Sequence, residues 1–215
     1  MGGHYVLPVG SSVGYLVDRD FQPFGGRPAD WIQKDLLDVR PEAIRRVVCE
    51  DPRSGRALYV LERPAPDRDP VWTGSVPGDD IRAARIDAVF RALINLSVED
   101  VVGPADDPTL IPLFDDPRPR LVYHLYDGAV YTIHPGPPLA GAGKGYALRV
   151  QVAYAPPAET NAQAAGALHP DADVAPAARA AALNARLAPW VYAVADWRHG
   201  SFLSDPGDLV APQAQ

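Results

Sequence analysis

The chain has 215 residues, of which 47% are hydrophobic and 22% are charged, and its formal net charge is −7. These values are typical of a globular protein with a core of its own, and they exclude a wholly disordered chain. The acidic balance, without a stripe of clustered Lys and Arg, argues against nucleic acid as a partner.

The numbers of proline, glycine and cysteine residues narrow the possible fold classes and exclude some kinds of site. The 24 prolines and 18 glycines favour many short elements joined by turns over a helical bundle. Cys49 is the single cysteine, which excludes an intrachain disulfide and the paired-cysteine metal sites. Between apolar neighbours, it is expected to be a small buried residue. No apolar run reaches the roughly 18–20 residues of a membrane helix.

The N-terminal third begins with an expected strand over Val13–Asp18 and a turn-rich stretch. Asp30, with Gln33 three residues later, has the spacing of a capping box and predicts a short helix over Trp31–Leu37. Residues 1–12 are expected to be a disordered or expression-derived start.

A hairpin and the clearest helix signal follow. Ile44–Glu50 and Arg56–Glu62 are predicted to pair around the turn at residues 51–55. A helix is predicted from Asp80 to Leu96, because its large apolar residues recur at spacings of three and four. We expect this apolar face to pack on a sheet that contains the hairpin; its residues are Ile86, Val89, Phe90 and Leu93.

The second half predicts another hairpin, a long strand and a helix. Asp127-Gly128 is typical of a tight two-residue turn between Leu121–Tyr126 and Ala129–His134. That turn would pair Tyr123 with Thr132, His124 with Tyr131 and Leu121 with His134. The expected elements after it are a strand over Tyr146–Ala155, a mobile stretch over Pro156–Pro176, a helix over Ala175–Leu187 and a strand over Trp190–Asp196.

This order predicts an α+β fold with mainly antiparallel sheets and a few helices. A motif of an aromatic strand, an Asp, a loop and a closing Asp-Leu segment occurs twice, in residues 15–39 and in residues 190–210. We therefore expect repeated units of strand hairpin, helix and closing strand. Residues 13–110 would form the first unit and residues 111–215 the second.

The candidate chemical groups favour no catalytic, cofactor-binding or metal site. His199, near Asp196, has no further ligands beside it and is interpreted as part of a solvent-facing loop cluster with Trp197 and Arg198. His124 and His134 would not face each other across their hairpin. The remaining candidates are a glycine-rich loop at residues 141–145 around Lys144, which lacks the Ser or Thr of a phosphate loop, and solvated Asp pairs at 106–107 and 115–116. The tryptophans, among them Trp31, Trp72 and Trp190, are expected to be core anchors.

Several of these segments together resemble the domain-of-unknown-function family 4340. The resemblance lies in Trp31–Val39, Ile44–Glu50, Val71-Trp72, the helix from Ile81 to Leu96, Glu99-Asp100-Val101, the Tyr126-Asp127-Gly128 turn and Leu183–Tyr192, and it covers most of residues 13–210. It implies a bacterial protein held by an N-terminal membrane helix, with the repeat region in the periplasm, as an accessory protein of an ABC transporter. The family has no established catalytic residues to carry over.

The expected function is therefore a non-enzymatic periplasmic interaction domain whose partners are ABC transporter subunits or other envelope proteins. The anchor would lie upstream of residue 1. Two alternatives stay open: a periplasmic module that binds a lipid or a glycan between two sheet layers, and a hydrolase with dispersed catalytic residues.

Overall fold

The structure is a computed structural model that describes residues 4–6, 10, 12–17, 32–74, 81–115, 118–140, 145–156, 175–203 and 205–210. The chain divides into two compact units, residues 1–33 and residues 34–215. In the first unit, β1 (His4–Val6) pairs antiparallel with β2 (Tyr15–Val17). Within the expected disordered or expression-derived start over residues 1–12, residues 4–6 therefore form a strand, whereas the origin of this segment stays a prediction.

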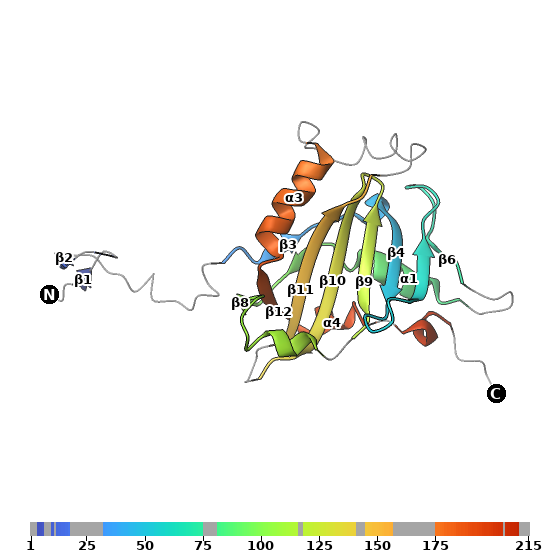
Figure 1. Ribbon diagram of the computed structural model, residues 1–215. Helices are drawn as coiled ribbons and strands as arrows, with labels where there is room; N and C mark the ends of the chain where they lie inside the picture. The colour runs from blue at the N-terminus through green and yellow to red at the C-terminus, as the bar shows by residue number, and fades with distance from the viewer. Residues whose placement is uncertain are drawn as a thin grey trace. The chain divides into compact units, whose positions relative to one another are not determined.

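The second unit is built on an eight-stranded antiparallel sheet in the order β6-β5-β4-β9-β10-β11-β12-β8 (Figure 1). Its strands are β4 (Ile44–Glu50), β5 (Ala57–Glu62), β6 (Val71–Trp72), β8 (Asp100–Pro104), β9 (Arg120–Leu125), β10 (Ala129–Pro138), β11 (Tyr146–Tyr154) and β12 (Trp190–Val194). A small second sheet pairs β3 (Asp35–Leu37) with β7 (Leu96–Ser97). The helices are α1 (Ala83–Arg91), α3 (Pro176–Leu187) and α4 (Asp196–Gly200), with 3₁₀ turns η3 (Pro41–Ala43), η4 (Ile111–Phe114) and η6 (Pro206–Leu209). The predicted α+β class with mainly antiparallel sheets is confirmed.

The large sheet draws strands from both predicted units, 13–110 and 111–215. Strand β4 lies beside β9, and β8 lies beside β12. The two segments of the apparent repeat also differ: β2 belongs to a two-stranded hairpin, whereas β12 lies between β11 and β8. Their closing segments are the strand β3 and the 3₁₀ turn η6. The predicted equivalence of the two segments is therefore wrong, because similar local sequences found different partners in the fold.

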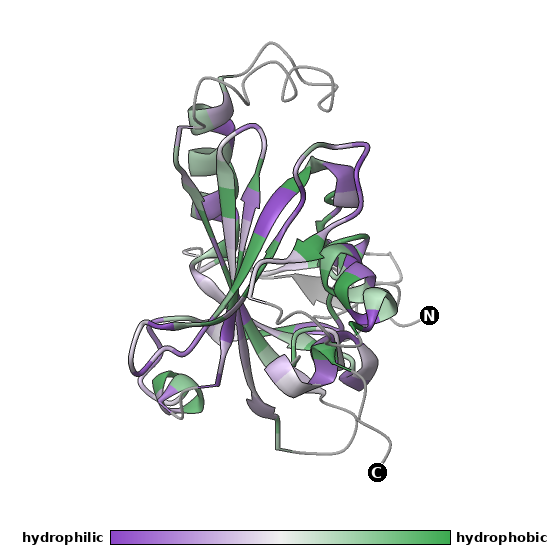
Figure 2. Ribbon diagram, turned by 90° about the vertical axis from the view of Figure 1, so that its right-hand side faces the viewer, coloured by the Kyte–Doolittle hydropathy of each residue, from purple (hydrophilic) through white to green (hydrophobic). Residues whose placement is uncertain are grey.

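One face of the sheet forms the core. Side chains alternate across a strand, so the strand pairing places two rows of residues on this face, which we call the core face. The two rows, all buried, are Leu61, Val47, Tyr123, Tyr131 and Val152, and then Tyr59, Cys49, Leu121, Ile133 and Val150. Figure 2 shows hydrophobic and hydrophilic residues alternating along the strands, as a sheet with one buried face requires.

Helix α1 packs on the core face with the predicted side. Ile86, Val89, Phe90 and Leu93 are 0–3% exposed. The Tyr123 hydroxyl of β9 donates a hydrogen bond to the Val89 carbonyl at 3.3 Å, which ties the helix to the strand next to β4. The helix lies behind the sheet in Figure 1.

The helix is shorter than predicted at its C-terminal end. It stops at Arg91, and Asn95 adopts a positive φ of 45° that turns the chain into β7. The Asn95 N–H donates to the Asp38 carboxylate at 3.1 Å, and Leu96 then pairs with β3. Asp79 and Asp80 lie outside the described residues, so their capping role stays a prediction.

Two other predictions made from local sequence are wrong, because contacts with distant residues decide the local structure. The helix predicted over Trp31–Leu37 is wrong: Asp35–Leu37 form the strand β3, because Leu36 and Leu37 become buried when β3 pairs with β7. In the β9–β10 hairpin, Tyr123 pairs with Tyr131 and Leu121 pairs with Ile133, one residue away from the predicted register.

The register shift has a visible cause in the turn. Tyr126 leaves the hairpin: its N–H donates to the Ala43 carbonyl at 3.0 Å and its hydroxyl to the Arg63 carbonyl at 2.6 Å. The loop therefore takes three residues and ends on Gly128, whose φ is 88°. Asp127 at its centre is buried and pairs with Arg179 of α3.

Helix α3 lies along the edge of β11 that β12 leaves unpaired (Figure 1). The Val152 N–H of β11 donates to the Asn184 side chain at 2.8 Å, so a helix side chain takes the place of a neighbouring strand. The predicted strand over Tyr146–Ala155 and helix over Ala175–Leu187 are confirmed. Most of Pro156–Pro176 lies outside the described residues.

Candidate functional site

The second face of the sheet carries charged, polar and apolar side chains, and we call it the open face. Its side chains alternate with those of the core face. They are Glu62, Arg46, His124 and Val130 in one row, Val60, Val48, Val122, Thr132 and Gln151 in the next, and Glu50, Arg120, His134 and Arg149 in the third. The described helices leave the middle of this face uncovered in Figure 1, whereas η4 covers one end, where the Arg149 guanidinium lies 5.3 Å from the centre of the Phe114 ring.

Ion pairs on the open face are partly exposed. Arg120 contacts Glu50 at 2.8 Å, and Arg46 lies 3.5 Å from Glu62 with both side chains at least 40% exposed. Arg149 adds a third guanidinium, so this face carries more positive than negative charge although the whole chain is acidic. Such a face suits a partner of negative potential.

The two predicted hairpin histidines both lie on the open face but in different rows. His124 faces Val130 on β10, whereas His134 faces Arg149 on β11 and shares a 3.2 Å hydrogen bond with Gln151. Burial lowers the pKa of both imidazoles, and neighbouring arginines act in the same direction. These shifts favour the neutral form of both rings.

A second feature of this site is a cluster of three arginines at one end of the open face. Arg45, Arg46 and Arg63 line a pocket of about 220 Å³, together with Glu62, Pro64 and Val71. A β-bulge between Ile44 and Arg46 disturbs the alternation of β4, so that the consecutive Arg45 and Arg46 both reach the pocket. The Arg63 N–H donates to the Arg45 carbonyl at 2.7 Å and brings the third arginine alongside.

Arg63 is held from the core side. Its residue is 8% exposed, its guanidinium lies 5.0 Å above the Phe90 ring, and one terminal nitrogen donates to the Arg68 carbonyl at 2.6 Å. These contacts leave its Nε without a hydrogen-bond partner among the described residues, and the same is true of the buried Nε atoms of Arg45 and Arg46. Three arginines with unpaired, buried Nε atoms and a single carboxylate residue therefore line the pocket.

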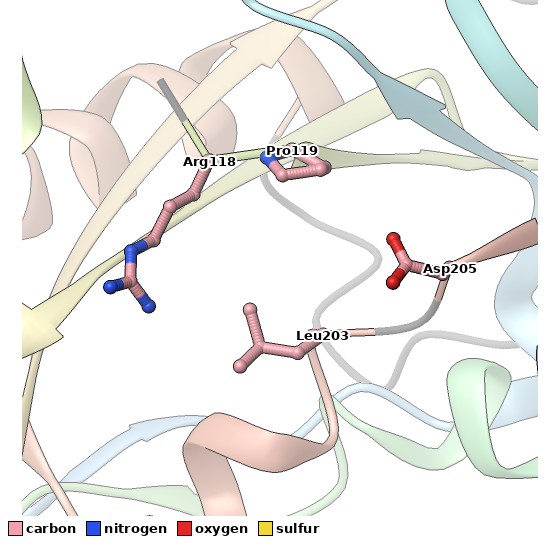
Figure 3. Close-up of a pocket in the computed structure, with 4 residues that line it drawn as sticks. All are labelled: Arg118, Pro119, Leu203 and Asp205. Carbon is pink, nitrogen blue, oxygen red and sulfur yellow. The ribbon is translucent and has the colours of Figure 1, made fainter. Parts of the chain in front are cut away.

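A different pocket of about 240 Å³ lies between β9 and the C-terminal segment (Figure 3). Arg118 and Asp205 line it from opposite sides, with Leu203 and Pro119 between them. The two charges offset each other, so this pocket has no net preference for an anion or a cation.

The structure corrects the interpretation of His199. The segment is the helix α4, and His199 is 1% exposed rather than solvent-facing. Its ring stacks on Tyr146 at 4.2 Å, and Nε2 lies 2.8 Å from the Gly136 carbonyl. Burial lowers the pKa of His199. Only Trp197 faces solvent as expected, at 66% exposure, beneath the Arg198 guanidinium.

The tryptophans do not all anchor the core. Trp190 is 41% exposed and Trp197 is 66% exposed, whereas Trp72 is half-buried in β6. The core is filled instead by Tyr123, Tyr126, Phe90 and Phe202. Trp31 lies outside the described residues. The prediction of tryptophan anchors is therefore wrong for Trp190, which is an exposed residue at the start of β12.

The remaining candidates behave as local structure. Asp107 accepts hydrogen bonds from the backbone and hydroxyl of Thr109, both at 2.8 Å, and these bonds lower the pKa of its carboxyl. Cys49 is buried as predicted, and burial raises the pKa of its thiol to about 11. Lys144 and most of its glycine loop lie outside the described residues, as does Asp116. Among the described His, Cys, Asp and Glu residues, no group of three is placed to hold a metal ion.

Sequence reasoning missed the arginine cluster. The adjacent Arg45 and Arg46 looked like ordinary strand positions, and Arg63 lies 17 residues away, by the numbering, at the end of the partner strand. The signal that could have found the cluster is the pairing of Ile44–Glu50 with Arg56–Glu62, which brings the start of one strand to the end of the other.

Protein-family models, curated proteins and solved structures were compared with the chain, and none matches. The resemblance to family 4340 therefore stays a prediction. None of the helices in the described part of the chain has the length and apolar character to cross a bilayer.

Proposed function

We propose that this chain is a non-enzymatic interaction domain in the bacterial periplasm, part of a membrane-anchored accessory protein that binds a subunit of an ABC transporter. The membrane anchor, the periplasmic location and the transporter come from the sequence resemblance alone. The observation that carries the binding role is the open face, where partly exposed charged and polar side chains extend over neighbouring strands of one rigid sheet.

The charges on this face indicate what kind of surface it contacts. Arg46, Arg120 and Arg149 lie with Glu50 and Glu62 on a protein whose net charge is −7. A local excess of arginine on an acidic protein favours a partner surface with Asp or Glu residues, since complementary potentials speed and orient association. Arginine also suits such an interface, because its planar group binds a carboxylate through two hydrogen bonds.

The lipid- or glycan-binding alternative has less support. It requires a cavity between two sheet layers, whereas the described residues form one large sheet with helices on its core face. The hydrolase alternative requires convergent titratable groups, and the two histidines of the open face occupy separate rows.

Photo-crosslinking in cells that make the full-length protein tests the proposal. A photoreactive residue at Thr132 or Gln151, in the middle row of the open face, should crosslink to a transporter subunit. The same residue at Arg85, an exposed position of α1 on the other side of the sheet, is the control and should not. Arg120→Glu should abolish the Thr132 crosslink by reversing a charge on the face. Equal crosslinking from Arg85, or none from the open face, would contradict the proposal.

A further inference from the structure

The arginine cluster has the properties of a ligand site at one end of the open face, with which it shares Arg46 and Glu62. We propose that the pocket lined by Arg45, Arg46 and Arg63 binds a phosphate group, carried by a small solute or by a lipid headgroup. The pocket can hold such a ligand whether or not the open face binds a transporter subunit.

The first argument is the unsatisfied donors. The Nε atoms of Arg45, Arg46 and Arg63 are buried and have no hydrogen-bond partner within the described structure. Arg46 Nε is 3.5 Å from the Glu62 carboxylate, which is close enough for an ion pair but does not form a hydrogen bond. A buried donor that is left unpaired destabilises a protein, and a charged donor does so more strongly. An anion in the pocket would offset part of the cost of burying these charged groups.

The second argument is charge. Three guanidinium groups face one carboxylate around the pocket, which leaves two positive charges. A phosphate monoester carries about −1.5 to −2 at neutral pH, whereas a carboxylate carries a single negative charge. The charge of a phosphate therefore matches the surplus, and its oxygens suit the fork of donors that each arginine presents.

The third argument is preorganisation. The Arg63 guanidinium is fixed between the Phe90 ring and the Arg68 carbonyl, and the bulge in β4 fixes where Arg45 and Arg46 leave the strand. Because these groups are already ordered, a ligand does not have to immobilise them on binding. The volume of about 220 Å³ accommodates one phosphate group with its first attached atoms.

Isothermal titration calorimetry of the folded protein with inorganic phosphate, in a chloride buffer, is the direct test. Saturable binding is expected, and Arg46→Gln should raise the Kd about ten-fold or more, because a charge-assisted hydrogen bond is lost. Arg45→Gln is a second variant on the same pocket. Glu62→Gln should lower the Kd by about two- to five-fold, because it removes the repelling carboxylate. Arg85→Gln makes the same charge change on the exposed side of α1 and should leave the Kd unchanged.

Sedimentation with phosphatidylcholine vesicles that contain phosphatidic acid separates the two sources of phosphate. Binding to inorganic phosphate that Arg46→Gln or Arg45→Gln weakens supports the proposal with a soluble ligand. Binding only to the phosphatidic-acid vesicles, weakened by the same variants, supports it with a lipid headgroup. No binding in either assay, or binding that neither variant weakens, overturns it. The crosslinks from Thr132 and Gln151 are read separately, so the failure of either proposal leaves the other testable.

Discussion

Replacing Phe90 by alanine should be among the most destabilising single changes in α1. The Phe90 residue is 0% exposed, and the Arg63 guanidinium lies 5.0 Å from the centre of its ring. Truncation of a buried Phe to Ala commonly lowers the free energy of unfolding by about 3–5 kcal/mol. The upper part of this range is expected here, because Tyr123 ties the neighbouring Val89 to β9 and the helix cannot easily collapse into the cavity.

Thermal and urea unfolding of the Phe90→Ala protein measure this loss. For a chain of this size, about 4–5 kcal/mol corresponds to a fall in Tm of about 8–20 °C. Arg85→Ala, at an exposed position of the same helix, is the matched control and should change stability by less than about 0.5 kcal/mol. If Phe90→Ala unfolds at the same temperature and urea concentration as the parent protein, α1 does not pack on the sheet through this face.

Two further predictions concern a turn and the pH. Gly145→Ala should destabilise the protein by about 1–3 kcal/mol or more, because Gly145 has a φ of 66° and an added Cβ would lie 2.2 Å from the Val194 carbonyl oxygen. The control is Gly207→Ala, which should be close to neutral because no atom lies within 4 Å of the added Cβ. Equal Tm values for the two variants would refute the argument. Burial lowers the pKa of His124, His134 and His199 in the folded state. The contribution of these histidines to stability is therefore complete above the pKa of histidine in the unfolded chain, about 6.5, and is lost as the pH falls below that pKa. Urea unfolding between about pH 7.5 and about pH 5 should therefore show a declining free energy of unfolding, with a shallower decline in His199→Gln, and an identical slope in that variant would contradict the assignment.

Local patterns were sufficient to predict most of the regular elements. Alternating and β-branched residues predicted β4 and β5, and the three-and-four spacing of Ile86, Val89, Phe90 and Leu93 identified the buried side of α1. These predictions succeed because a helix or strand that buries one side must repeat its apolar residues with the period of a helix or of a strand. This period does not depend on which element packs against the buried side. The α+β class follows from the order of such elements along the chain.

The apparent repeat shows the limit of this reasoning. Residues 15–17 and 190–194 both have strand-like sequences, yet one forms a two-stranded hairpin and the other completes a large sheet. An aromatic strand that ends near an Asp is a local preference, whereas the partner of that strand is chosen by residues far away in the chain. The sequence predicted these two strands but not their neighbours.

The sequence by itself determined the long strands and helices, though not β3 or α4, and which side of α1 is apolar. Only the tertiary structure decided the hairpin register, the burial of His199 and the meeting of Arg45, Arg46 and Arg63. The register shifted because Tyr126 bonds to Ala43 and Arg63, and the arginines meet because a bulge in β4 coincides with the end of β5. Each of these outcomes depends on contacts between residues distant in sequence. Such contacts do not produce a periodic pattern of hydrophobic residues from which they could be predicted.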